Sequence, residues 1–104
     1  MIVEQRDYHV HTGKLNEVVA MYRAEGIELQ RKHLGNLIGV FTTDIGALST
    51  YTALWSYDSY AEREQRRASL QADPQWKDFL ARLQPLLHTQ QNRILIPTEF
   101  SPIR

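Results

Sequence analysis

Two segments near the middle of the chain are dense in β-branched and aromatic residues. They are Leu37–Thr43 and Thr50–Tyr57, and Asp44-Ile45-Gly46 lies between them. Strand-forming runs separated by Asp and Gly are typical of a hairpin. The pattern therefore predicts a β-hairpin whose turn is centred on residues 44–46.

Both faces of this hairpin are apolar, which is unusual. Strict alternation divides the first arm into two sets, Leu37/Gly39/Phe41 and Ile38/Val40. On the second arm one face carries Tyr51, Ala53, Trp55 and Tyr57, and the opposite face carries Leu54. A hairpin with one solvated face would alternate apolar and polar residues, so each face of this one needs a cover.

The flanking segments predict two further strands and two helical regions. The expected strands are Ile2–Val10 and Leu86–Ile96. Helical spacing of apolar residues covers 15–33 and 74–83, and a further helix is expected over about 60–72. Ser59 and Glu62 form a capping box at the start of the second helical region, and Asp73-Pro74 restarts it. Gly35 provides a stop for the first helix.

The predicted order is β-α-β-β-α-β in one domain over residues 1–104. This order favours an α+β, ferredoxin-like sandwich with an antiparallel sheet of strand order 4-1-3-2 and all helices on one side. The other side of the sheet would remain exposed to solvent. Each large apolar side chain left exposed there forgoes about 1.5–3 kcal/mol of the stabilisation that burial provides. We therefore expect a homodimer in which two such sheets pack face to face and close an α+β barrel.

Charge and composition narrow the function classes. The chain has 12 basic and 12 acidic residues, a formal net charge of zero and no cysteine. A balanced charge argues against nucleic-acid binding, and the lack of cysteine excludes disulfides and thiolate chemistry. The longest apolar run, Val18–Tyr22, is far too short for a membrane span. We expect a soluble cytoplasmic protein that does not insert into membranes.

Glu4, Arg6 and Tyr8 alternate along the first strand and so share one face. Charged groups on a buried strand are costly unless they are paired. One interpretation is a structural Glu4–Arg6 pair. The other is the polar floor of a ligand pocket, in which Arg6 holds an anion or enolate and Tyr8 transfers a proton.

Other candidates for a pocket come from the third strand and the second helical region. Trp55 and Tyr57 form an aromatic row that is either core or a stacking wall for a flat ligand. Arg63 and Arg67 share a helix face, which is either solvated or able to reach an anion or a partner chain. Glu62 and Arg66 should pair at i, i+4.

The four histidines do not form a metal-binding frame. His9 and His11 share a strand face, but no ligand spacing is completed by a carboxylate or a third histidine. We expect neither a metal nor a cofactor. His33 should end the first helix, where the helix dipole favours a protonated imidazole, and it is also the best candidate for a general base.

Read in order, these motifs resemble the NIPSNAP family of dimeric α+β barrels over nearly the whole chain. The matching pieces are Glu4-x-Arg6-x-Tyr8, Gly13-Lys14-Leu15, His33-Leu34-Gly35, Gly39, Thr43, Gly46, Leu54-Trp55-x-Tyr57-Asp58-Ser59, Arg63, Arg67, Asp73-Pro74-x-Trp76 and Phe100-Ser101-Pro102. One departure is Ala53, where relatives often have a histidine.

The resemblance implies a fold and a dimer more than a reaction. Similar barrels include small monooxygenases, ring isomerases and haem-binding proteins that often hold a ligand between sheet and helices. We expect this chain to bind a small aromatic or carbonyl-bearing molecule, with cofactor-free oxygenation or proton transfer as its chemistry if it is an enzyme. The alternative is a non-catalytic structural or partner-binding dimer. A cavity lined by Arg6, Tyr8 and Trp55 would favour the first.

Overall fold

The four strands form one antiparallel sheet in the order β2-β3-β1-β4. The computed structural model describes residues 1–104. Its strands are β1 (Ile2–Val10), β2 (Asn36–Thr42), β3 (Thr50–Tyr57) and β4 (Leu87–Leu95). This order is the expected 4-1-3-2 counted from the other edge, so the predicted α+β topology is confirmed.

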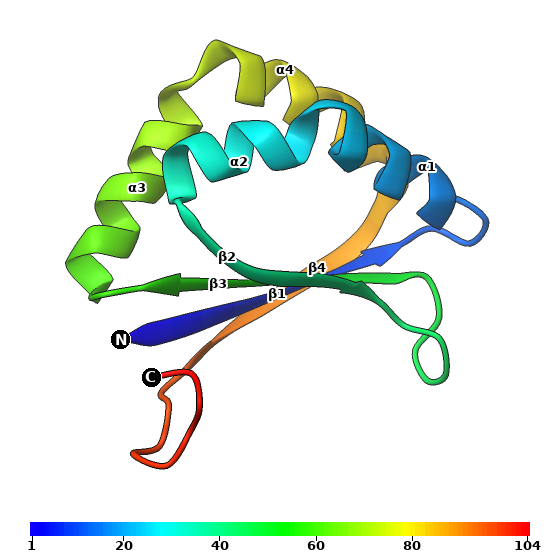
Figure 1. Ribbon diagram of the computed structural model, residues 1–104. Helices are drawn as coiled ribbons and strands as arrows, with labels where there is room; N and C mark the ends of the chain where they lie inside the picture. The colour runs from blue at the N-terminus through cyan, green and yellow to red at the C-terminus, as the bar shows by residue number, and fades with distance from the viewer.

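All helices cover the same face of the sheet (Figure 1). The first helical region consists of α1 (Leu15–Met21), a π-helical turn η1 (Tyr22–Gly26) and α2 (Ile27–Leu34). The second consists of α3 (Tyr60–Ala72), α4 (Pro74–Leu83) and the 3₁₀ turn η2 (Gln84–Leu86). None of these helices is long and apolar enough to cross a bilayer.

The predicted helix boundaries are confirmed by their caps. Ser59 Oγ accepts a hydrogen bond from the Glu62 amide at 3.1 Å, and Asp73 Oδ1 accepts one from the Gln75 amide at 2.9 Å. Gly35 ends α2 with φ of 89°, a left-handed conformation that costs glycine no steric strain. Three short-range signals in the sequence thus place three helix ends.

The side of the sheet that faces the helices carries the core. Tyr51, Ala53, Trp55 and Tyr57 of β3 all lie on this side and are 3% exposed or less. Helical residues such as Val18, Leu70 and Phe79 pack with them in one buried cluster. The aromatic face of the hairpin is therefore the inner face.

The predicted division of β2 into two faces is wrong after Leu37. The register between β2 and β3 shifts between Leu37 and Gly39, so β2 contains one extra residue there. Leu37 pairs with Trp55 and Val40 with Ala53, which places both toward the helices, whereas Phe41 pairs with Thr52 on the outer face. Strict alternation could not foresee this bulge.

The outer face of the sheet has no helix over it, and only the C-terminal tail lies against part of it (Figure 1). Phe41 is 55% exposed and Leu95 is 40% exposed on this face. The tail contributes Ile96, Pro97 and Ile103 to a shallow apolar groove with Val3, Ile38 and Leu54. The homodimer that would cover this face remains a prediction.

Candidate functional site

A cavity of about 360 Å³ lies between the sheet and the helical layer. It is lined by residues of β1, β4 and most of the helical segments, and its polar members are Arg6, Tyr8, Gln30, Arg67, Gln71, Gln84, His88, Thr89 and Gln90. Tyr22, Trp76 and Leu83 contribute apolar and aromatic surface. Its volume is within the range of about 300–1,000 Å³ usual for small-molecule sites.

Glu4 contacts the cavity residue Arg6 and accepts four hydrogen bonds in total from three side chains. Its side chain is fully buried and accepts bonds from Arg63 at 2.7 and 3.1 Å, from Arg6 at 3.0 Å and from Asn92 at 2.8 Å. Burial alone would raise the pKa of Glu4, but the bonds from Arg63 and Asn92 and the charge of Arg6 outweigh it and lower the pKa to about 2. Glu4 is therefore an ionised structural anchor.

Arg6 connects that anchor to the cavity. Its Nη1 contacts Glu4, and its Nε donates to the Tyr8 hydroxyl at 2.9 Å. Tyr8 is 5% exposed and lines the cavity beside Arg6. Both interpretations of this strand therefore hold in part: Glu4–Arg6 is a structural pair, and Arg6 with Tyr8 forms part of a cavity wall.

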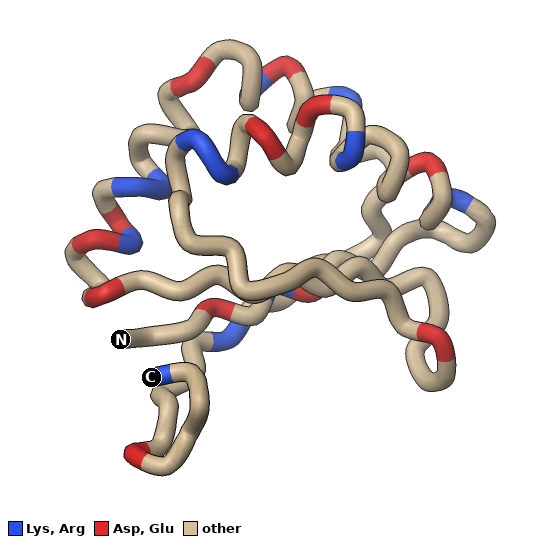
Figure 2. Tube along the Cα trace, in the orientation of Figure 1, with Lys and Arg blue, Asp and Glu red and all other residues tan.

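Arg67 is the cationic group of the cavity without a counter-ion. It projects from α3 and lines the cavity, and it forms no hydrogen bond or ion pair with the chain, whereas Arg6 and Arg63 both contact Glu4. Burial and the neighbouring Arg6 charge lower the pKa of Arg67. No Asp or Glu side chain lines the cavity. Figure 2 shows acidic and basic residues interleaved over the helical layer, so this local excess of positive charge departs from the balanced surface.

Three tyrosines pack together beside Arg6. The ring centroids of Tyr22 and Tyr51 are 4.6 Å apart, those of Tyr8 and Tyr51 6.0 Å, and those of Tyr8 and Tyr22 6.5 Å. Burial and the adjacent phenols raise the pKa of both Tyr22 and Tyr51, which therefore stay neutral. Tyr22 begins the π-helical turn, a local structure common at functional sites.

Three buried polar side-chain atoms have no hydrogen-bond partner: Gln30 Oε1, Trp55 Nε1 and Tyr57 Oη. Such atoms are few in native proteins, and each costs about 1–3 kcal/mol. Gln30 lines the cavity, but Trp55 and Tyr57 do not. The expectation that Trp55 forms a wall of the Arg6–Tyr8 pocket is therefore not met, because Trp55 is fully buried in the core.

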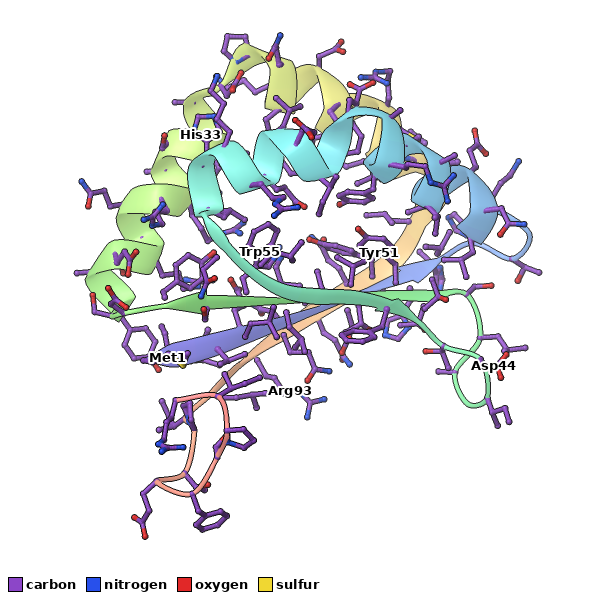
Figure 3. All side chains as sticks on the ribbon, in the orientation of Figure 1. Met1, His33, Asp44, Tyr51, Trp55 and Arg93 are labelled. Atoms are coloured by element: carbon purple, nitrogen blue, oxygen red, sulfur yellow. The ribbon has the colours of Figure 1, made fainter.

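His33 also lies outside the cavity. Figure 3 shows it on the helical layer beside α3, whereas Trp55 and Tyr51 point from the sheet toward the helices. Its Nδ1 lies 2.8 Å from Ser69 Oγ and its Nε2 lies 2.8 Å from Asp73 Oδ2. The structure does not bring His33 together with Arg6 and Tyr8; its contacts join the end of α2 to α3 and the α3–α4 junction.

Of the remaining expected site residues, Arg63 forms an ion pair with Glu4 and does not line the cavity. Sequence reasoning missed Gln30. It named Arg67 as a residue that shares a helix face with Arg63 and is either solvated or able to reach an anion or a partner chain, and the structure places Arg67 in the cavity wall. A signal for Gln30 exists, because Tyr22, Gly26 and Gln30 are spaced by four residues along one helical region and are all buried. This spacing predicts one inward-facing helical stripe.

The NIPSNAP family model matches residues 3–102. The chain belongs to the NIPSNAP family. It is 33% identical over 101 residues to Protein NipSnap of Drosophila melanogaster. This match covers 97% of this chain and 36% of the fly protein. The chain thus spans about a third of that relative's length.

Solved structures agree with this assignment. A NIPSNAP family protein from Agrobacterium tumefaciens is 48% identical with a TM-score of 0.97, and the match covers 99% of this chain and 98% of that one. SnoaB, a cofactor-independent oxygenase from Streptomyces nogalater, shares the fold at 13% identity and a TM-score of 0.67, over 97% of this chain and 96% of that one. At this identity the likeness extends to the fold alone. The expected family and ferredoxin-like fold are confirmed.

Proposed function

We propose that this NIPSNAP domain binds a small, flat, carbonyl-bearing anion in the cavity between its sheet and its helices. The observation that carries the proposal is Arg67, a partly buried guanidinium that lines the cavity and has no counter-ion in the chain. A buried cation without a partner is costly, and a ligand carboxylate or enolate would remove that cost.

The neutral walls of the cavity support a flat ligand. Tyr22 and Trp76 are both buried and both line the cavity, so they offer aromatic surface in the same space as the polar groups of Arg6 and Arg67. Apolar walls with a few convergent polar groups are the usual composition of a small-molecule site.

The chemistry that we propose for this site is cofactor-free proton transfer at a carbonyl compound. Arg67 and Arg6 would stabilise an enolate oxygen, and the Tyr8 hydroxyl, which accepts a hydrogen bond from Arg6, would donate its proton to the enolate carbon and become a phenolate beside the Arg6 guanidinium. SnoaB, a cofactor-independent oxygenase, is built on the same fold, which is consistent with a cofactor-free site in this fold.

Isothermal titration with a matched pair of probes tests the binding proposal. We expect 2-naphthoate to bind and the neutral naphthalen-2-ylmethanol to bind far more weakly. Replacement Arg67→Met should weaken 2-naphthoate binding about 10- to 100-fold, because a charge-assisted hydrogen bond is lost. The control Arg31→Met removes an exposed guanidinium from α2 and should change nothing. Failure of 2-naphthoate to bind at millimolar concentration, or equal binding by Arg67→Met, would contradict the proposal.

The second candidate is a non-catalytic dimer, and the outer sheet face favours it. Phe41 and Leu95 are exposed there, beside the apolar groove that Val3, Ile38 and Leu54 form with the tail. We propose that a second copy of the chain covers this face. The proposed dimer interface and the proposed ligand site lie on opposite faces of the sheet, so the two proposals are compatible. If the protein dimerises but binds no ligand, a purely structural role is the remaining function.

A further inference from the structure

The proton transfer proposed for Tyr8 needs a second titrating group. When the Tyr8 hydroxyl protonates the enolate carbon it becomes a phenolate, and another group must return that proton before the next turnover. The same group can take the hydroxyl proton of an enol and so produce the enolate that Arg67 and Arg6 hold. Such a group has to line the cavity and has to accept and release a proton near neutral pH.

The side chain of the cavity wall that meets both requirements is His88. No Asp, Glu or Lys lines the cavity, the arginines stay protonated, and the glutamines and the threonine do not titrate. Burial raises the pKa of Tyr22, so this phenol stays neutral. Histidine is the side chain whose charge ordinarily changes between about pH 5 and 8.

The register of the sheet turns the His88 side chain toward the helices. Arg6 pairs with Asn92 and Tyr8 with Gln90, and residues paired directly across two strands share a face. The Asn92 amide reaches the buried Glu4 carboxylate, which shows that this face is the inner one. His88 is two residues before Gln90, so alternation gives it the same orientation.

His88 is also the extra residue of a β-bulge. His9 pairs with Thr89 but Val10 pairs with Leu87, so His88 has no partner on β1. Leu87 packs against the core, and the bulge therefore places Leu87 and His88 on the same side of the sheet. Bulges are frequent next to active sites, where they redirect a side chain.

The position of His88 connects the cavity with solvent. β4 is an edge strand and His88 is exposed on it, whereas Tyr8 is buried on the neighbouring strand. Tyr8 and His88 are diagonal neighbours on the inner face, close enough for two side chains of this size to reach one ligand. His88 can therefore exchange protons with water at the rim of the cavity.

We propose that His88 is the general base of this site and the group that restores the proton of Tyr8. This inference rests on the proposed function, since it assumes an enol whose anionic group is held by Arg67. His88 takes the enol hydroxyl proton and becomes an imidazolium, Tyr8 gives its proton to the carbon, and the C=C bond is replaced by a C=O bond. The imidazolium then returns its proton to the Tyr8 phenolate through water, so the enol becomes the ketone with no net change in protons.

The test follows the conversion of the phenylpyruvate enol to its ketone by the loss of the ultraviolet absorbance of the enol. Phenylpyruvate is an aromatic anion with a carbonyl group, and we expect the unchanged protein to accelerate its conversion. His88→Gln should lower kcat about 100-fold or more, the usual contribution of a positioned general base, while the affinity for 2-naphthoate stays within about twofold. His11→Gln is the matched control, because His11 is exposed, packs its ring 5.3 Å from that of His88 and does not line the cavity. Its rate should stay within about twofold.

Chemical rescue distinguishes a base from a structural residue. His88→Ala leaves space at an exposed position, so added imidazole should restore the rate in proportion to its concentration. The same imidazole should not rescue Tyr8→Phe, because that variant lacks the proton donor.

The outcomes separate this inference from the proposed function. Suppose that 2-naphthoate binds in an Arg67-dependent manner. If the unchanged protein then fails to accelerate the conversion, if His88→Gln keeps its rate, or if imidazole restores nothing, the role of His88 is refuted and the anion site stands. An equal loss of rate in His11→Gln would also refute it. If 2-naphthoate does not bind at all, both proposals fail.

Discussion

At the scale of single residues, one buried carboxylate organises three basic side chains into different roles. Glu4 forms ion pairs with Arg6 and Arg63, whereas Arg67 forms no ion pair within the chain. The alternation of Glu4, Arg6 and Tyr8 was visible in the sequence, but the bonds from Arg63 and Asn92 were not, because they come from residues 59 and 88 positions away.

The lowered pKa of Glu4 predicts how stability depends on pH. The folded-state pKa of about 2 lies below the ordinary value of 4.5 for a free glutamate, so Glu4 stabilises the fold above pH 4.5 and loses this contribution as the pH falls toward 2. The shift corresponds to about 3 kcal/mol of unfolding free energy. Denaturant titrations from pH 6 to pH 2.5 should show the loss, and Glu4→Gln should remove its pH dependence.

Glu4→Gln should also lower the unfolding free energy at pH 7 by about 3–5 kcal/mol, because two guanidiniums lose a buried partner. Glu28→Gln, at an exposed position of α2, is the matched control and should retain the normal pH profile. An unchanged acid profile in Glu4→Gln would show that another carboxylate is responsible.

At the scale of elements, local signals predicted more than long-range ones. Apolar spacing and caps located every strand and both helical regions, because the hydrogen bonds at a helix end depend on residues within one turn. The bulge after Leu37 escaped prediction, since it is seen only in the pairing of β2 with β3. The π-helical turn escaped prediction for a similar reason, since Gly26 in this turn packs against Phe79, which belongs to α4 and is distant in the sequence.

Gly26 provides a test of this packing. A Cβ at this position would overlap the Phe79 ring, which is fully buried and cannot move away. Gly26→Ala should therefore lower the unfolding free energy by about 1–3 kcal/mol, although alanine is the better helix former. In a Phe79→Leu background the added methyl should cost less, and denaturant titration of the four proteins measures the coupling. Stabilisation by Gly26→Ala alone would mean that helix propensity outweighs the contact.

At the scale of the whole molecule, the sequence predicted the residues of β1 that line the cavity but not the residues of the helices that line it. Arg6 and Tyr8 were expected to line a pocket and do so. Trp55 and His33 were expected beside them and lie elsewhere, because sequence spacing gives the face of an element but not which elements meet across the interior. Gln30 and Arg67 reach the cavity only through the packing of α2 and α3 over the sheet.

The uncovered outer face predicts the oligomeric state. Sedimentation at low micromolar concentration should give twice the 12.1 kDa mass of one chain, because a second sheet would bury Phe41 and Leu95. Phe41→Asp should shift the protein toward monomer while leaving its far-ultraviolet circular dichroism unchanged. Thr42→Asp, on the exposed end of the same strand but facing the helical side, serves as a control. A monomer in the unchanged protein would leave the outer face solvated and remove the proposed interface.

The position of a bound anion tests the central claim most directly. A crystal structure of the unchanged protein with 2-naphthoate should place the carboxylate within hydrogen-bonding distance of the Arg67 guanidinium, with the rings against Tyr22 and Trp76. Density for the naphthoate on the outer face of the sheet, with the Arg67 cavity filled by rearranged protein side chains, would contradict the account.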